Sequence, residues 1–121
     1  MKRDMDLARQ IMLELEKSPY TGGWLHTSVE GHSQEEVNYH VMLLAKPGLV
    51  EAQEHETLSL SSVAEWLPIS LNMEGHDFLE AAKNETIWRK AKKFIQDKGG
   101  ALTFEVVKTV LAQVALKQVV S

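Results

Sequence analysis

The sequence predicts an α+β domain that is mainly α-helical and carries one small antiparallel hairpin. Three observations lead to this fold class. Residues 33–46 have a clear helix start and a Pro-Gly stop. The apolar runs 49–54 and 66–72 favour two strands joined by a polar loop around residues 55–62. Elsewhere the apolar residues recur at helical spacing, near the N-terminus and through the C-terminal third.

Length and composition indicate one ordinary globular domain. The chain has 121 residues, of which 44% are hydrophobic and 25% charged. It contains no Cys, which excludes disulfides, thiolate catalysis and Cys-based zinc sites. No apolar run approaches the roughly 18 residues of a membrane span, and no secretory signal is present near the start. We therefore expect a cytoplasmic protein without a membrane partner.

The net charge of −4 is unevenly distributed. Residues 51–82 carry seven Asp and Glu and no Lys or Arg, whereas residues 83–121 carry eight Lys and Arg against three acids. The middle of the chain is acidic and the last third basic. This bears on any nucleic-acid hypothesis, because contacts to phosphate supply most non-specific affinity.

The helix at residues 33–46 is the best defined element. Ser33 can cap it, and Glu36 stands where a capping box requires Glu or Gln. Pro47 disfavours the helical conformation at Lys46, and Gly48 tolerates the turn that follows. Its apolar face consists of Val37, Val41 and Leu44.

Residues 4–17 form an amphipathic helix with an apolar stripe of Leu7, Ile11 and Leu15. Ser18-Pro19 and Gly22-Gly23 end it and form a loop. Residues 24–30 are compatible with a short strand or with one turn of helix. The choice matters, because a helix-turn-helix needs a helix directly before residues 33–46.

Beyond the central helix, Leu67, Ile69 and Leu71 alternate in the second strand and should share the core face. Pro68 cannot donate to a ladder, which places this strand at an edge. Asn72 is predicted to cap a helix over residues 73–83.

Two further helices are predicted as a C-terminal extension. Residues 85–98 carry Ile87, Trp88, Ala91 and Ile95 on one side and end at Gly99-Gly100. Thr103 is a possible cap for a last helix extending to residue 119. We therefore expect a single domain over residues 1–121, with a core at 1–84 and a helical extension at 85–121.

Two motifs resemble winged-helix DNA-binding domains. The capped helix V-x-x-H-V-x-x-L, followed by Gly-Leu-Val and a strand, resembles their recognition helix and first wing strand. The run ISLNMEGHDFL resembles the passage from the last wing strand into the next helix in many winged-helix regulators. The resemblance implies a winged-helix-like fold, with the hairpin as the wing, and a DNA-binding or transcription-regulatory function.

As a whole, the chain is similar to a phage- and prophage-associated family called domain of unknown function 2513. The resemblance covers roughly residues 1–93 and depends on MKRDMDLARQIMLELE, GHSQEEVNYHVMLLAKPGLVEA and WLPISLNMEGHDFLEAAKNETIWRKAK. It implies a phage or bacterial setting, and it brings no established activity.

Two functions remain open from the residues. If double-stranded DNA is the partner, the side chains expected to contact it are Gln34, Asn38, Tyr39, Met42 and Lys46. The expected phosphate contacts are Lys2, Arg3, Arg9, Arg89, Lys90 and Lys93. Against DNA, the helix begins with Glu35 and Glu36, which repel phosphate. The basic cluster at 89–93 is also compatible with a solvated helix face. The alternative function is a protein-interaction module, with a host or phage protein as partner, that kept the winged-helix scaffold and lost DNA binding.

Enzymatic chemistry has no support in the motifs, so we expect no catalytic residue, metal or cofactor. The five histidines lack the H-x-x-x-H spacing of a helical zinc site. His40 is expected to be a partly buried core residue with one ring nitrogen bonded to backbone.

The last helix predicts self-association. Val106, Val110 and Val114 broaden its apolar stripe beyond what one internal face requires. Because an exposed row of valines forms an apolar patch, we expect a homodimer through residues 102–119. The alternative is a helix buried entirely within its own chain.

Overall fold

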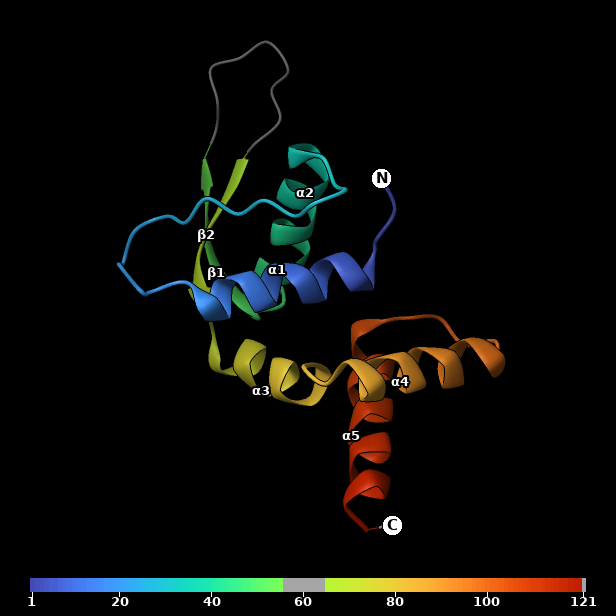
Figure 1. Cartoon of the computed structure of the whole chain (residues 1–121). Helices are drawn as coiled ribbons and strands as arrows, with labels where there is room; N and C mark the ends of the chain where they lie inside the picture. The colour runs from blue at the N-terminus through green and yellow to red at the C-terminus, as the bar shows by residue number, and fades with distance from the viewer. Residues whose placement is uncertain (56–64, 121) are drawn as a thin grey trace. The chain divides into compact units, whose positions relative to one another are not determined.

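The computed structural model describes residues 1–55 and 65–120, the last three by their backbone alone (Figure 1). The described residues form five helices and two strands. These are α1 Met5–Lys17, α2 Gln34–Ala45, β1 Val50–His55, β2 Glu65–Leu71, α3 Met73–Ala82, α4 Glu85–Asp97 and α5 Phe104–Val120. The predicted α+β, mainly α class is confirmed. Most of the predicted polar loop lies outside the described residues.

The chain divides into two compact units, Met1–His76 and Asp77–Ser121. The first contains α1, α2, the hairpin and the first turn of α3, and the second contains the rest of α3 with α4 and α5. The boundary between the units in the chain therefore falls within α3, and the predicted single domain with a division between residues 84 and 85 stays a prediction. The winged-helix assignment stays a prediction.

In the first unit, α1 packs against α2 and β2, and α2 packs against both strands. Asp4 caps α1 by accepting from the backbone N–H groups of Asp6 and Leu7. The buried face of α1 includes Leu7, Ile11 and Leu15, as predicted. The buried face of α2 includes Val37, Val41 and Leu44, also as predicted. These two apolar stripes form most of the core of this unit.

The hairpin is antiparallel, with Val50 opposite Leu71 and His55 opposite Glu65. Its register shifts between Glu51, which pairs with Ser70, and Ala52, which pairs with Pro68. Ile69 is thus the extra residue of a β-bulge.

The bulge overturns the predicted alternation in β2. An extra residue moves the following side chains to the opposite face, because side chains alternate along a strand. Pro68 and Leu71 are buried as a result, while Leu67 and Ile69 are only partly buried. The prediction that Leu67, Ile69 and Leu71 share one core face is therefore wrong.

Residues 24–29 form neither of the two structures considered from the sequence. They have no regular secondary structure, and the Leu25 N–H donates to the carbonyl oxygen of Pro68 in β2 at 2.8 Å. A turn follows, closed by a bond of 3.1 Å from the His32 N–H to the Val29 oxygen, with Gly31 at φ 85°. No described residue between α1 and α2 is helical, so a helix-turn-helix does not form here.

The start of α3 is locked onto the corner between α2 and β1. The carbonyl oxygen of Leu49 accepts from the Asn72 N–H at 2.9 Å. A Cβ added at Gly75 would lie 2.1 Å from that oxygen, so only glycine fits. The side-chain amide of Asn72 donates to the Gly48 oxygen at 3.2 Å. Asn72 therefore stands at the predicted N-cap position, where its carbonyl oxygen accepts from the His76 N–H at 2.9 Å, while its side-chain amide N–H binds the preceding corner.

In the second unit, α4 packs against α5. Phe78 of α3 stacks on Phe104 of α5, with ring centroids 4.3 Å apart, and meets Trp88 of α4 edge to face at 6.4 Å. Thr103 accepts from the Val106 N–H at 3.2 Å, as predicted for the cap. The buried residues of α4 are Trp88, Ala91 and Ile95.

The valines of α5 differ in burial. Val110 is only 8% exposed within its own chain, whereas Val106 is 40% exposed. Val110 is therefore part of the core of this unit and is not available to a second copy, contrary to the expectation for the homodimer. The homodimer through residues 102–119 itself stays a prediction. Within the described residues no helix is long and apolar enough to cross a membrane.

We expect Gly75→Ala to lower the free energy of unfolding by about 2 kcal/mol or more, measured by urea denaturation. Alanine favours helices over glycine by roughly 1 kcal/mol. This gain is smaller than the cost of displacing the Leu49 carbonyl, which is backbone and cannot rotate away. The control is Gly23→Ala, whose Cβ would meet only Thr21 Oγ1 at 3.7 Å. An unchanged or increased stability of Gly75→Ala would contradict this close approach.

Candidate functional site

A groove of about 1190 Å³ lies in the first unit, between α2, β2 and the segment 24–27. Its apolar lining includes Trp24, Leu25, Tyr39, Met42, Trp66 and Leu67. Trp24 is 51% exposed although it is one of the largest apolar side chains in the chain. The groove therefore presents aromatic surface to a ligand.

Trp24 is held in position by two contacts with β1. Its Nε1–H donates to Gln53 Oε1 at 2.8 Å. Its ring meets the edge of His55 at a centroid distance of 5.8 Å. Because these contacts orient the indole, it forms a fixed wall of the groove.

The edge of β2 beside the groove has its hydrogen-bonding groups largely occupied. The Trp66 N–H donates to the side-chain oxygen of Asn38 on α2. Pro68 has no N–H, and its carbonyl oxygen accepts from Leu25. A ligand strand would find few partners on this edge, so recognition in the groove depends on side chains.

Three carboxylates gather at one end of the groove. Glu54 pairs with Trp66 in the hairpin register, and Glu65 directly precedes Trp66. Glu35 lies one helical turn before Asn38, whose side chain binds the Trp66 N–H. Within the described part of the chain, none of the three makes an ion pair. The groove therefore has unpaired carboxylates at this end.

The opposite end of the groove carries Lys46, the only Lys or Arg among its described lining residues. Along α2, Lys46 is about 16 Å from Glu35, from the rise of roughly 1.5 Å per residue. The groove is therefore polarised along the helix, acidic at the start of α2 and basic past its end.

All five residues predicted to contact DNA line this groove: Gln34, Asn38, Tyr39, Met42 and Lys46. Two of them already bind within the chain. Gln34 Nε2 donates to the Thr27 oxygen at 3.1 Å, and Asn38 accepts from Trp66. Both amides would have to exchange these partners for base edges. The hairpin and the segment 24–27 also enclose this face of α2.

The predicted phosphate contacts are divided between the two units of the chain. Lys2 and Arg3 are exposed in the first unit, and Arg89, Lys90 and Lys93 are exposed on α4 in the second. Arg9 is only 5% exposed. A buried guanidinium cannot reach a surface phosphate, so the structure argues against that role for Arg9.

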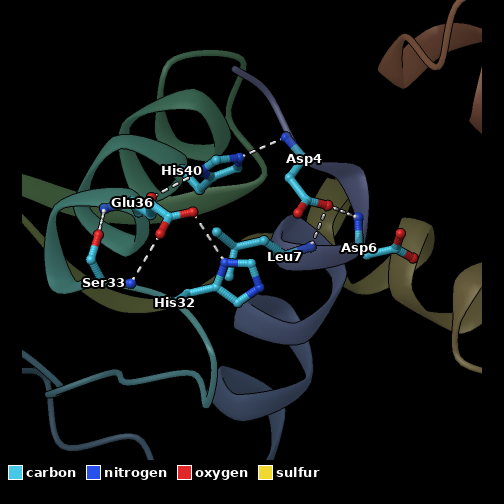
Figure 2. Close-up of polar contacts among 7 residues, drawn as sticks. All are labelled: Asp4, Asp6, Leu7, His32, Ser33, Glu36 and His40. Carbon is cyan, nitrogen blue, oxygen red and sulfur yellow. Dashed lines mark hydrogen bonds and ion pairs between the residues drawn. The ribbon is translucent and has the colours of Figure 1, made fainter. Parts of the chain in front are cut away.

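The start of α2 carries the predicted capping box, which Figure 2 shows. The Glu36 N–H donates to Ser33 Oγ, and the Ser33 N–H donates to Glu36 Oε1, both at 3.1 Å. His32 Nδ1 lies 3.2 Å from Glu36 Oε2. The backbone N–H of Ser33, followed by the His32 side chain, holds the pKa of Glu36 below its ordinary value of 4.5.

His40 joins α2 to the start of α1 (Figure 2). The Asp4 N–H donates to His40 Nε2 at 2.8 Å, so the imidazole proton is on Nδ1. Nδ1 in turn donates to the backbone carbonyl oxygen of Glu36 at 2.8 Å. The predicted core position is confirmed, and both ring nitrogens, rather than one, bind backbone. With both nitrogens occupied and the residue buried, His40 has a structural role.

Sequence reasoning missed Trp24, Trp66, Glu54 and Glu65 as site residues. The signals in the sequence were the tryptophans at residues 24 and 66 and the acidic stretch 51–82. Trp24 was not connected with that stretch because it lies far from it in the chain. Among the residues that the structure describes, no group of three or more His, Asp and Glu side chains could hold a metal ion.

We expect His40→Ala to lower the free energy of unfolding by about 2–4 kcal/mol, because two buried hydrogen bonds and the packing of the ring are lost. Chemical denaturation measures this. His76→Ala, at an exposed position of α3, is the matched control and should change stability little. Equal stability of the two variants would mean that the His40 bridge contributes nothing.

We expect Glu36→Gln to remove a pH-dependent part of the stability. Since the folded pKa of Glu36 is below the unfolded value, its carboxylate stabilises the fold above about pH 4.5, and this is lost as the pH falls through the folded pKa. Urea denaturation should therefore show a gap between wild type and Glu36→Gln that is largest near pH 7 and shrinks on acidification.

Ser33→Ala is the control for this pH dependence. It removes a helix cap and about 1 kcal/mol of stability, but it keeps the backbone N–H that contributes most to the shift. It should therefore retain the pH-dependent term. A gap between wild type and Glu36→Gln that stays constant across the pH range would be the contrary result.

The comparisons with known proteins identify a family. Residues 2–101 match the family described as "Hypothetical protein (DUF2513)". The chain is also 35% identical, over 122 residues, to an "Uncharacterized protein" of Haemophilus influenzae, and the alignment covers 100% of both chains. No solved structure matches. The phage association and the winged-helix character stay predictions. On the family match and the full-length relative, the chain belongs to the DUF2513 family.

Proposed function

We propose that this chain is a protein-interaction module whose groove binds a partner segment with an aromatic or large apolar side chain next to Lys or Arg. The observation that carries the proposal is the combination of aromatic walls and three unpaired carboxylates in one groove. In the bacterial or phage setting that the family resemblance implies, a host or phage protein can supply such a segment.

The aromatic lining supplies the affinity. Burying an apolar side chain contributes roughly 1.5–3 kcal/mol, and aromatic residues dominate the energetics of interfaces. Trp24 loses little freedom on binding, because Gln53 and His55 already orient it. A pre-oriented wall reduces the entropy cost of association.

The charges supply the specificity. Glu35, Glu54 and Glu65 attract a basic flank of the partner and repel acidic segments. Lys46 past the end of α2 favours an acidic or neutral residue at the other end of the bound segment. A segment with a basic end and a less basic end would therefore bind in one direction along α2.

The same features disfavour DNA in this groove. Phosphates would meet three carboxylates and a single lysine, whereas DNA-binding surfaces concentrate Lys and Arg. The amides of Gln34 and Asn38 are engaged within the chain, and the described residues before α2 supply no supporting helix. Of the two functions considered from the sequence, protein interaction therefore has the stronger support.

Selection from a random peptide display library tests the proposal. We expect the wild-type protein to enrich peptides that place Trp, Phe or Leu beside Lys or Arg. The double variant Glu54→Lys/Glu65→Lys should bind these peptides at least about tenfold more weakly, because attraction becomes repulsion.

Glu51→Lys is the matched control. It makes a single charge reversal of the same kind on β1, the strand of Glu54, at an exposed residue that does not line the groove, so binding should persist. Random double-stranded DNA at low salt is the second probe. Enrichment of acidic peptides, no enrichment at all, or DNA binding that Glu54→Lys/Glu65→Lys strengthens would overturn the proposal.

A further inference from the structure

The two units of the chain carry opposite charge. Residues 1–76 contain five Lys and Arg against twelve Asp and Glu, whereas residues 77–121 contain eight against five. The acidic unit contains the groove, and the basic unit contains α4. The charge that the groove requires in a partner is thus present on another part of the same chain.

The exposed face of α4 combines cations with an aromatic side chain. Phe94 is 47% exposed, and Lys98 Nζ lies 5.8 Å from the centroid of its ring. Lys90 precedes Phe94 by four residues, which places the two side by side on the helix. Lys93 is exposed beside them. Trp88, Ala91 and Ile95 of α4 are buried in the core of its unit, and Phe94 lies at the border of this buried face.

Acidic neighbours on α4 reduce its positive charge only partly. Asp97 pairs with Lys93 at 3.1 Å and Glu85 with Arg89 at 4.0 Å. All four side chains are more than half exposed, and such ion pairs contribute little and can be exchanged for others. Within the described residues, Lys90 makes no ion pair. The face therefore presents an aromatic ring flanked by available cations.

We infer that the groove of one copy binds the α4 face of a second copy, with Phe94 against the aromatic walls and Lys90 and Lys93 against the carboxylate end. This inference rests on the proposed function and names its partner. The charge complementarity between the groove and α4 selects a second copy as the occupant. An amphipathic helix in a groove is a recurring mode of recognition.

This interface differs from an isologous dimer. The groove and α4 are distinct surfaces, so each copy can use its groove on one neighbour and its α4 on another. Such a heterologous contact produces rings or open chains whose size grows with concentration. It also differs from the homodimer through residues 102–119, because it does not use the exposed Val106 of α5.

Sedimentation velocity tests the inference on the full chain. We expect the mass of the wild type to rise with concentration and to fall when NaCl is raised from about 0.05 M to about 0.5 M, because salt screens exposed charges. Glu54→Lys/Glu65→Lys and Lys90→Glu/Lys93→Glu should each weaken self-association by about tenfold or more. Phe94→Ala, which changes no charge, should weaken it as well.

Recombining the variants isolates the contact. In a mixture of Glu54→Lys/Glu65→Lys with Lys90→Glu/Lys93→Glu, the first variant supplies an intact α4 face and the second an intact groove. The mixture should therefore associate although each variant alone does not. Both pairs of substitutions in one chain should restore association through reversed charges. Glu51→Lys and Val106→Glu are controls and should leave it unchanged.

The outcomes distinguish this inference from the proposed function. A wild type that stays monomeric at all concentrations overturns the second-copy partner. Self-association of both double variants as strong as that of the wild type overturns it as well. A wild type that stays monomeric and still selects basic aromatic peptides leaves the groove a peptide site and removes only this inference. Loss of association in Val106→Glu alone would assign the contact to α5 and would also overturn it.

Discussion

The carbonyl oxygen of Leu49 is the constraint on which the first unit depends. It accepts from the N–H of Asn72 and lies against Gly75, so the end of α2, the start of β1 and the start of α3 meet at one point. Because peptide groups are rigid, this corner fixes the position at which β1 begins and the position at which β2 ends. The β-bulge at Ile69 then sets which β2 side chains face α2. Trp66 and Pro68 line the groove because of these two constraints.

His40 connects α2 to the start of α1. Its two ring nitrogens bind the backbone carbonyl oxygen of Glu36 within α2 and the Asp4 N–H at the cap of α1, so a buried polar bridge joins the two helices. A buried imidazole satisfied on both sides costs little and specifies one arrangement of its neighbours. The groove lies on the side of α2 that carries Asn38 and Met42, and the His40 side supports it from within. Two core residues of α2, Val37 and Val41, also line the groove, so the core and the groove border each other on this helix.

Much of the secondary structure was predictable from local signals. The capping box of Ser33 and Glu36 and the Pro47-Gly48 stop bounded α2 closely, since caps depend on residues only a few positions apart. The hairpin pairing was also predictable, because both strands contain apolar and β-branched residues. The candidate site was predictable in part. The α2 face from Gln34 to Lys46 was identified, but its ligand was assigned by fold resemblance, and the opposing wall around Trp24 was missed.

The sequence by itself determined the class, the α2 boundaries and the acidic and basic division of the chain, because these depend on composition and on neighbours within about one helical turn. Only the tertiary structure decided the rest. Residues 24–29 form neither strand nor helix, and Leu25 among them donates a hydrogen bond to Pro68 of β2, which is more than forty residues away. The burial of Arg9 and Val110 depends on which helix face meets its neighbours. Trp24, Glu35 and Glu54 line one groove because packing brings distant segments together. No local sequence pattern predicts which distant segments pack against each other.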